Sequence, residues 1–370
     1  MNRKKIFLAS VLKPVNEARM YEKFAKSLAD YYEVHVAGHE GKNKNIHKNI
    51  YLYPLFQLTR LSFDRFFAPW KIYQLMVKIK PQLVVACTHE LLIAACFYKL
   101  FHKTKLVYDV QENYYFNIKY TQTFPLVIRN ILACYVRAKE KLCGHFIDHF
   151  ILAEKCYEEE LPFLRTKYTV IENKYRPLEE EAIQPVKKSK TINLLYSGTI
   201  SLEYGIFEAV NLAKKLYEVN NSIRLTIIGW SAKEQTAKAL RKEIEGVPFI
   251  NLITDHKPVP HQKIIKEISQ ADFGLLSYRP NKSTCNRLPT KLFEYTAHKL
   301  PMLINKNPKW ESLSKAYNSA ILLDYHNFDP NHVLGLMSST TFYDKGDTNQ
   351  VLWKTEEQKL YKTINHLLNP

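Results

Sequence analysis

Glycine is scarce in this chain of 370 residues, with only 10 occurrences, less than half the usual share of about 7%. No Gly-x-Gly-x-x-Gly follows the first apolar run, which argues against a nicotinamide or flavin cofactor. Also missing are the P-loop motif, the Gly-x-Ser-x-Gly nucleophile elbow and the His-Glu-x-x-His zinc motif. These absences argue against P-loop nucleotide hydrolysis, α/β-hydrolase chemistry and zinc peptidase chemistry.

Cysteine pairs, metal motifs and long apolar runs are also missing. The six cysteines form no Cys-x-x-Cys pair, and they lie in apolar stretches as reduced, buried residues of a cytoplasmic protein do. No Asp-x-Asp occurs, so the usual carboxylate pair that holds a metal on a nucleotide is lacking. The best candidate for a membrane span, 83–101, contains His89, Glu90 and Lys99. We therefore expect no metal, no other cofactor and no membrane-spanning helix.

Positive charge is concentrated in the first part of the chain. The formal net charge is +17, and residues 1–150 carry 23 basic against 11 acidic side chains. Such an excess favours a polyanionic partner: nucleic acid, anionic lipid or a phosphorylated substrate. A generally basic proteome would give the same excess without any such partner.

Short apolar runs alternate with longer helical patterns along the whole chain. This alternation predicts an α/β fold with parallel sheets covered on both faces. The pattern stops at 173–190, a charged stretch with two prolines that is typical of a linker, and then restarts. We expect two Rossmann-like domains, 1–175 and 176–350, with a ligand cleft between them, followed by a C-terminal helix at 351–370 that returns to the first domain. The expected strands are 5–12, 34–38, 50–53, 83–87, 105–109, 150–153, 169–172, 192–197, 224–229, 249–252, 273–277 and 302–304; the main helices are 17–31, 65–79, 91–101, 126–145, 206–217, 232–245, 261–270 and 289–298.

Two stretches of the second half combine features of an anion site. Gly198, Gly205 and Gly229 follow consecutive strands, where backbone N–H groups can point at an anion, although each glycine could be a plain turn former. In 286–304, proline 289 stands at the start of a predicted helix that places Lys291 and Glu294 on one face. A lysine beside a helix N-terminus suits a diphosphate, and a carboxylate one turn further suits a ribose. The spacing alone fits a plain surface ion pair equally well.

The same residues resemble a known family. Leu288-Pro289-Thr290-Lys291-Leu292-Phe293-Glu294-Tyr295, followed by Leu300-Pro301, is similar to the donor motif of family-four nucleotide-sugar glycosyltransferases of the GT-B fold, of the kind that assemble bacterial surface polysaccharides. Further motifs follow in the expected order: Glu17-Ala18-Arg19, Thr88-His89-Glu90, Tyr108-Asp109-Val110-Gln111-Glu112, Tyr196-Ser197-Gly198-Thr199 and a closing helix from Trp353 to Leu360. The resemblance spans nearly the whole chain.

The resemblance implies a role for each matching residue. Glu294 would hold the ribose, and Lys291 with the helix N-terminus would hold the diphosphate. His89 and Glu90 would contact the sugar. Together with Arg19 and Lys291 they would be the catalytic residues. The remaining donor-site residues implied are Gly198, Thr199, Gly229, Trp230, Val259, Tyr278, Arg279, Asn286, Leu288 and Pro289, with Trp230 and Val259 as candidates for the base.

The chain departs from the family pattern at three charged positions. Asn286 stands where the family often has a second carboxylate, and Thr199 and Tyr204 stand where it often has Arg and Lys on the phosphates. Arg279, Lys282 and Arg287 are candidates to replace the lost charge. These departures leave open a noncatalytic anion- or membrane-binding protein with a decayed site, and the fold equally admits a sugar-nucleotide 2-epimerase.

The basic first half points to a membrane surface once the resemblance is taken into account. Segment 59–80 places aromatic residues, Trp70 and Tyr73 among them, between basic ones, and 129–141 adds four more basic residues. A core helix with a solvated basic face fits the same pattern. No nucleic-acid recognition module is visible. We therefore expect a retaining, metal-independent glycosyltransferase acting on a glycan or lipid-linked acceptor at the cytoplasmic face of the membrane.

Overall fold

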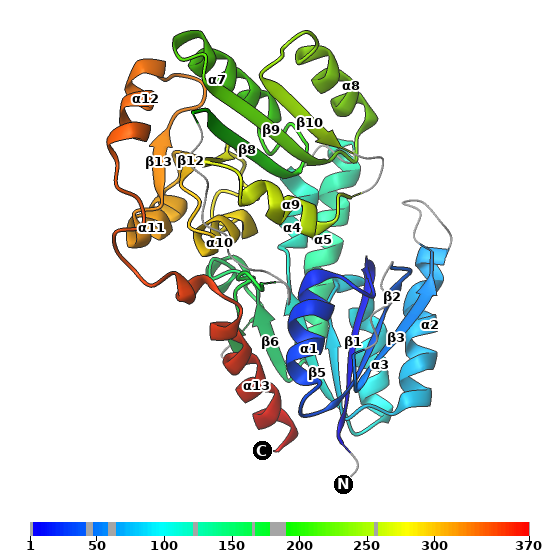
Figure 1. Cartoon of the computed structure of the whole chain (residues 1–370). Helices are drawn as coiled ribbons and strands as arrows, with labels where there is room; N and C mark the ends of the chain where they lie inside the picture. The colour runs from blue at the N-terminus through cyan, green and yellow to red at the C-terminus, as the bar shows by residue number, and fades with distance from the viewer. Residues whose placement is uncertain are drawn as a thin grey trace. The chain divides into compact units, whose positions relative to one another are not determined.

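The computed structural model describes residues 3–41, 47–57, 64–120, 125–164, 167–177, 190–254 and 258–369. The chain divides into two compact units: unit 1 comprises Met1–Arg176 with Trp353–Pro370, and unit 2 comprises Pro177–Leu352. Each unit contains one parallel β-sheet flanked by helices, as the alternating sequence pattern predicts (Figure 1). In the described part of the chain, no helix is long and apolar enough to cross a membrane.

Unit 1 is built on a seven-stranded sheet with the order β3-β2-β1-β4-β5-β6-β7. Every neighbouring pair of these strands runs parallel. Because β1 lies between β2 and β4, the direction of chain progression reverses there, and ligands of such sheets bind outside the carboxyl ends at this point. The strands are β1 (Lys5–Pro14), β2 (Glu33–His39), β3 (Ile50–Phe56), β4 (Leu83–Ala86), β5 (Lys105–Val110), β6 (His149–Leu152) and β7 (Tyr168–Val170).

Helices cover both faces of this sheet because its strands are apolar on both sides. Phe7 and Ala9 of β1 belong to the core under one set of helices, and Ile6 and Leu8 to the core under the other. The first set is α2 (Asp64–Ile79), α3 (Leu92–Phe101) and α5 (Leu126–Cys143); the second is the π-helix η1 (Ala18–Ala25), α1 (Lys26–Leu28) and α13 (Lys354–Leu368). Shorter helices are η2 (His89–Leu91), α4 (Tyr114–Tyr120), which packs on α5, and α6 (Tyr157–Glu160).

Unit 2 repeats the plan with a six-stranded sheet in the order β10-β9-β8-β11-β12-β13. The chain progression reverses at β8, which lies between β9 and β11. The strands are β8 (Ile192–Thr199), β9 (Ile223–Trp230), β10 (Ile250–Thr254), β11 (Phe273–Leu276), β12 (Met302–Asn305) and β13 (Ala320–Leu323). The core on one face includes α7 (Ile206–Val219), α8 (Glu234–Glu243) and α12 (Pro330–Ser339); that on the other includes α9 (His261–Ile268), α10 (Thr290–Ala297) and α11 (Pro308–Tyr317); η3 (Thr348–Val351) follows.

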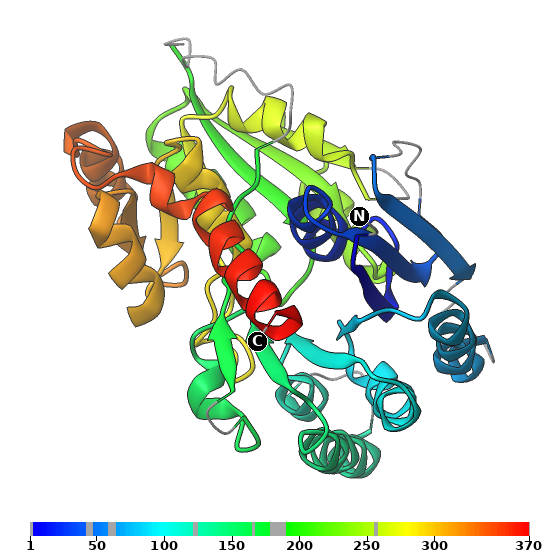
Figure 2. The ribbon, with the colours of Figure 1, turned by 90° about the horizontal axis from the view of Figure 1, so that it is seen from below.

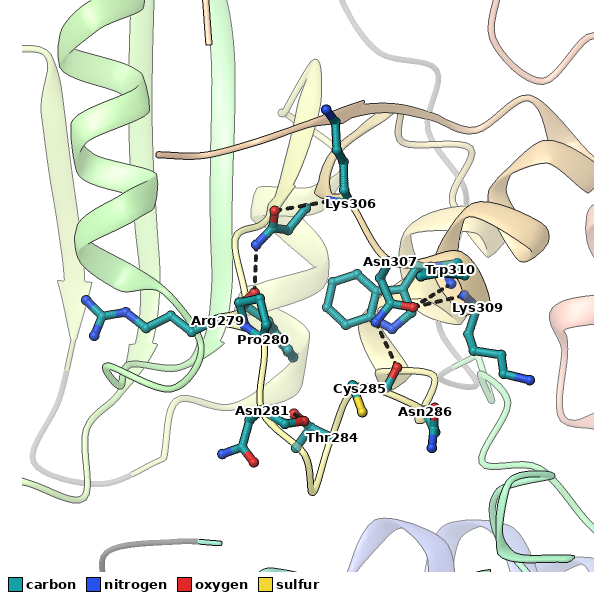
Figure 3. A pocket seen from close by; sticks show the side chains of 13 residues that line it. Arg279, Pro280, Asn281, Thr284, Cys285, Asn286, Lys306, Asn307, Lys309 and Trp310 are labelled. Atoms are coloured by element: carbon teal, nitrogen blue, oxygen red, sulfur yellow. Dashed lines mark hydrogen bonds between the residues drawn. The ribbon is translucent and has the colours of Figure 1, made fainter. Parts of the chain in front are cut away.

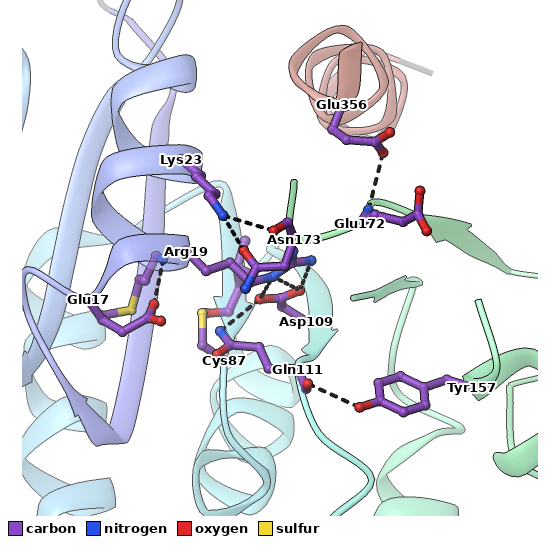
Figure 4. Close-up of polar contacts among 12 residues, drawn as sticks. Glu17, Arg19, Lys23, Cys87, Asp109, Gln111, Tyr157, Glu172, Asn173 and Glu356 are labelled. Carbon is purple, nitrogen blue, oxygen red and sulfur yellow. Dashed lines mark hydrogen bonds and ion pairs between the residues drawn. The ribbon is translucent and has the colours of Figure 1, made fainter. Parts of the chain in front are cut away.

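The end of the chain returns to unit 1 and is fastened there. Trp353 stacks on Phe24 with ring centroids 5.8 Å apart, and its indole N–H donates to Ser27 Oγ at 2.9 Å. Buried Glu356 of α13 pairs with Lys174 at 2.8 Å and accepts the backbone N–H of Glu172 (Figure 4).

The start of the predicted linker needs correction. Lys23 donates to both the backbone carbonyl and the side-chain oxygen of Asn173, and the Tyr175 carbonyl accepts the Trp353 N–H. The residues up to Arg176 therefore belong to unit 1 rather than to a linker. The rest of the predicted linker, 178–189, lies outside the described residues.

Candidate functional site

Two glycines shape the carboxyl ends of β8 and β9 in unit 2. Gly198 and Gly229 are register partners, and a Cβ on Gly229 would lie 1.8 Å from the carbonyl oxygen of Gly198. Gly198 has a φ of +109°, which side chains other than glycine rarely adopt, and a Cβ there would lie 3.3 Å from Cε of Lys291. The glycines thus let the two strand ends approach each other and bring Lys291 against the end of β8.

Helix α10 carries the charged pair of the predicted donor motif. Pro289 caps its N-terminus, and Lys291 donates to Oε2 of Glu294 one turn later. Oε1 of Glu294 lies 2.5 Å from Nε2 of His261, the first residue of α9. Glu294 is only 6% exposed, whereas His261 is partly open to solvent. Lys291 and His261 therefore hold the Glu294 carboxylate from two sides, at the carboxyl ends of the strands.

The electrostatics of this trio keep Glu294 ionised. Burial by itself would raise the pKa of the Glu294 carboxyl, because it disfavours the charged form. The positive charge of Lys291 and the hydrogen bond from His261 outweigh burial and hold that pKa at about 2. A charged acceptor for hydroxyl groups is thus present throughout the physiological pH range.

The other predicted donor residues fall into three places. Thr199 and Trp230 are register partners at the same strand ends as the two glycines. Val259 and Leu288 are partly buried against the core below α9 and α10. Arg279 Nε donates to the buried carboxylate of Glu208 at 2.6 Å, so its charge is already matched by an acid of α7. Of the candidate replacement cations, Arg279 is therefore engaged elsewhere in unit 2.

A pocket of about 310 Å³ opens in unit 2 beyond the ends of β11 and β12. Tyr278, Arg279 and Asn286 line it, as do residues that the motif did not include (Figure 3). Asn307 caps α11 and donates to the Cys285 carbonyl, and Trp310 donates to the Arg287 carbonyl. The additional lining residues with polar or aromatic side chains are Asn281, Thr284, Asn305, Lys306, Asn307, Lys309 and Trp310.

His89 and Glu90 of unit 1 lie in a cluster of ionisable groups. His89 follows β4, is buried, and packs edge-on against Tyr114. Its Nδ1 lies 2.8 Å from Nζ of Lys139, and its Nε2 lies 3.5 Å from Glu90. Burial lowers the pKa of Lys139, although the charge of Glu90 opposes this shift. A charged Lys139 can only donate, so this contact favours the neutral His89 tautomer with its proton on Nε2, the nitrogen that faces Glu90.

Arg19 pairs with a carboxylate in the interior of unit 1. It is fully buried in η1 and forms a two-pronged pair with Asp109 at the end of β5, with distances of 2.8–3.1 Å (Figure 4). Burial alone would lower the pKa of Arg19, but the Asp109 charge raises it. The structure thus joins two motifs that the sequence places 90 positions apart. Arg19 meets a carboxylate of its own unit, and its part in turnover stays a prediction.

Sequence reasoning missed two side chains that contact the predicted ones. His261 contacts Glu294 from 33 positions away, and Lys139 contacts His89 from 50 positions away. The available signal for His261 was its place at the start of a helix that follows a strand, which puts it at the carboxyl edge of the sheet. No group of three or more His, Cys, Asp or Glu that could hold a metal ion occurs among the described residues.

Solved structures share this fold over the entire chain. Sucrose-phosphate synthase from Thermosynechococcus elongatus superposes with a TM-score of 0.73, at 14% identity over 99% of each chain. The fold is GT-B. HepE from Anabaena, in complex with UDP and glucose, gives a TM-score of 0.67, at 13% identity over 98% of this chain and 100% of its own. A Listeria monocytogenes protein assigned as a UDP-N-acetylglucosamine 2-epimerase gives 0.57, at 12% identity over 98% and 96%.

These likenesses establish the predicted architecture. At such low sequence identities they bear on the fold alone. No protein-family model matches the sequence, and no curated protein matches it either. Any activity must therefore be inferred from the side chains of this chain.

Proposed function

We propose that this protein is a glycosyltransferase that moves a sugar from a nucleoside diphosphate sugar to a glycan or lipid-linked acceptor. The observation that carries the proposal is the arrangement of Lys291 beside Gly198, with Glu294 one turn along α10. These residues lie near the end of β8, where the chain progression through the sheet of unit 2 reverses. This is the usual ligand position in such folds. Solved proteins of this fold contain UDP or UDP-glucose, which supports the same class of donor here.

The donor would be bound by charge and by backbone groups. Lys291 and the N-terminus of α10 would hold the diphosphate, and Glu294 would accept hydrogen bonds from the ribose hydroxyls. Gly198, Thr199 and Gly229 would frame the nucleotide, with Trp230 and Val259 toward the base. Binding requires Lys291 to turn from Glu294 to the phosphate, while His261 keeps the carboxylate in place.

Transfer would break the bond between the anomeric carbon and the diphosphate oxygen, and the oxygen of an acceptor hydroxyl would form the new bond to that carbon. The hydroxyl proton would pass to the departing nucleoside diphosphate. Negative charge develops on the departing diphosphate, so a fixed cation and oriented N–H groups beside it lower the barrier. We propose that Lys291 supplies this charge without a metal, and that the anomeric configuration is retained. In unit 1, His89 would meet the sugar through Nε2, and Arg19 would act as a positioning residue through Asp109.

The direct test is transfer itself. Purified protein is incubated with single nucleotide sugars and membrane extract, with and without EDTA, and release of nucleoside diphosphate and labelled glycolipid is measured. We expect one donor to be consumed in an acceptor-dependent manner that EDTA does not reduce. The Lys291→Ala variant should lose at least 100-fold in rate, as a lost transition-state contact of about 3 kcal/mol implies. Lys315→Ala, which alters an exposed lysine of unit 2, is the matched control and should keep full activity.

A sugar-nucleotide 2-epimerase is the second candidate. The ionisable groups of His89, Glu90 and Lys139 in unit 1, of which His89 contacts both others, favour it because epimerisation needs acid and base groups beside the sugar. Epimerisation needs no acceptor. Conversion of a UDP-N-acetylhexosamine to its 2-epimer in the absence of acceptor would therefore replace the transferase proposal.

A further inference from the structure

The face of unit 1 formed by α2, α3 and α5 exposes many apolar side chains. Helix α5 exposes Val127, Ile131, Tyr135 and Leu142, spaced so that they form one continuous stripe along the helix. Val127 is 70%, Ile131 64% and Leu142 68% exposed. In the described part of unit 2, by contrast, the exposed large apolar residues are Leu202 and Val219. Exposed large apolar side chains that gather on one unit in this way mark an interaction site.

The apolar surface continues across the neighbouring helices. Helix α3 packs against both α2 and α5, and Figure 2 shows the three nearly end-on along one side of the sheet. A chain of aromatic rings links α2 to α3: Trp70 stacks on Tyr73, Tyr73 meets Phe97, and Phe97 meets Phe101 at centroid distances of 4.9–5.7 Å. Phe101 is 67% exposed. The surface therefore extends over three helices and includes the aromatic part of the segment predicted at 59–80, of which 59–63 lies outside the described residues.

The exposed charge on these helices has one sign. Lys78 and Lys141 are exposed, and Lys103 is exposed just beyond α3. In α3, α5 and the part of α2 whose side chains are described, the one acidic residue is Glu140, which is 1% exposed. Nearby Asp148 is matched by Lys99 at 2.6 Å. An apolar face with exposed aromatics and lysines at its rim is complementary to a bilayer of anionic lipids.

We infer that the outer face of α2, α3 and α5 docks on an anionic lipid bilayer. The stripe of α5 and the rings of α3 enter the boundary between headgroups and acyl chains, and Lys103 and Lys141 contact lipid phosphates. This inference names the partner surface for the membrane-bound acceptor of the proposed function. It does not depend on the donor chemistry.

The test is flotation of the full chain with vesicles of phosphatidylcholine, with and without phosphatidylglycerol. We expect binding to the anionic vesicles, weakened by salt. The Val127→Glu/Ile131→Glu variant should lose at least tenfold in partition, and Lys103→Gln/Lys141→Gln about fivefold for each lysine removed. Leu202→Glu/Val219→Glu is the matched control, since it makes the same change on unit 2, and it should bind as the wild type.

Two further measurements separate the possible failures. Circular dichroism and melting temperature confirm that each variant is folded, and nucleoside diphosphate binding reports the donor site independently. No flotation of the wild type, or equal flotation of the α5 variant, overturns the inference. A concentration-dependent dimer that the α5 variant abolishes overturns it as well, because a second copy would then cover the face.

Discussion

At the scale of single residues, Glu294 is the most informative side chain. It is buried between Lys291 and His261, whose charge and hydrogen bond keep it ionised. We predict that Glu294→Gln weakens nucleoside diphosphate binding 10- to 100-fold, since a hydrogen bond to a charged group contributes about 1.5–3 kcal/mol. Isothermal titration calorimetry measures this loss. Glu311→Gln, which alters an exposed ion pair with Lys315 of the same unit, should leave the affinity unchanged.

The glycine at position 198 gives a second prediction at this scale. Gly198→Ala should weaken diphosphate binding by at least tenfold, because the new Cβ both strains the backbone and presses on Lys291. Gly246→Ala is the control, since Gly246 also has a positive φ but a Cβ there meets nothing within 4 Å. Both variants should lose about 1 kcal/mol of stability. Equal affinity in the two variants would show that the loop after β8 does not contact the ligand.

A third prediction concerns pH and the buried carboxyl of Glu140. Burial raises the pKa of Glu140 to about 7, opposed by Arg137, by the hydrogen bond from Tyr108 and by Lys139. A carboxyl whose pKa is higher in the folded than in the unfolded state costs stability as the pH rises from about 4.5 to 7. Glu140→Gln should therefore gain about 1–3 kcal/mol relative to wild type between pH 5 and pH 8. Urea unfolding at the two pH values tests this, and a pH-independent difference would contradict it.

At the scale of elements, the return of α13 to unit 1 depends on Trp353. Its ring is buried on Phe24 and its N–H is bonded to Ser27. We predict that Trp353→Ala destabilises unit 1 by about 3–5 kcal/mol, the usual cost of removing a buried aromatic ring. Differential scanning calorimetry would then show a lower unfolding transition for unit 1. An unchanged melting profile would mean that α13 is not held by this contact.

Many elements could be predicted from the sequence because the strands are short and continuously apolar. The expected 5–12 and 273–277 match β1 and β11 to within two residues. The first predicted helix differs, since its start is wound as the π-helix η1, where Arg19 meets Asp109 from another motif. Apolar periodicity carries no information about such a distant partner. Helix α4 and strand β13 were missed because each is short and lacks a clear period.

The candidate site was only partly predictable for the same physical reason. Lys291 and Glu294 share a helix, so their spacing alone places them on one face. His261 and Lys139 reach their partners through the fold, and the charge match between Arg279 and Glu208 is likewise a tertiary contact. Local sequence predicts which residues share a helix face. It does not show which side chains from other elements contact that face.

At the scale of the whole molecule, each unit carries a proposed binding site of its own. Unit 1 and unit 2 have their own sheets and their own buried cores, and the donor residues all belong to unit 2. A ligand that binds one folded unit raises the melting temperature of that unit by mass action. Nucleoside diphosphate should therefore shift the transition of unit 2, and anionic vesicles that of unit 1.

The most direct test of the central claim is the thermal stability of the purified protein with UDP, GDP, ADP, dTDP and CDP, each with and without EDTA. We predict that one of these diphosphates raises the melting temperature by several degrees, as about 2–3 kcal/mol of ligand binding would do. EDTA should not reduce that shift, and Glu294→Gln should remove most of it. No shift with any diphosphate, or an equal shift in the variant, would contradict the assignment of Lys291 and Glu294 as a donor site.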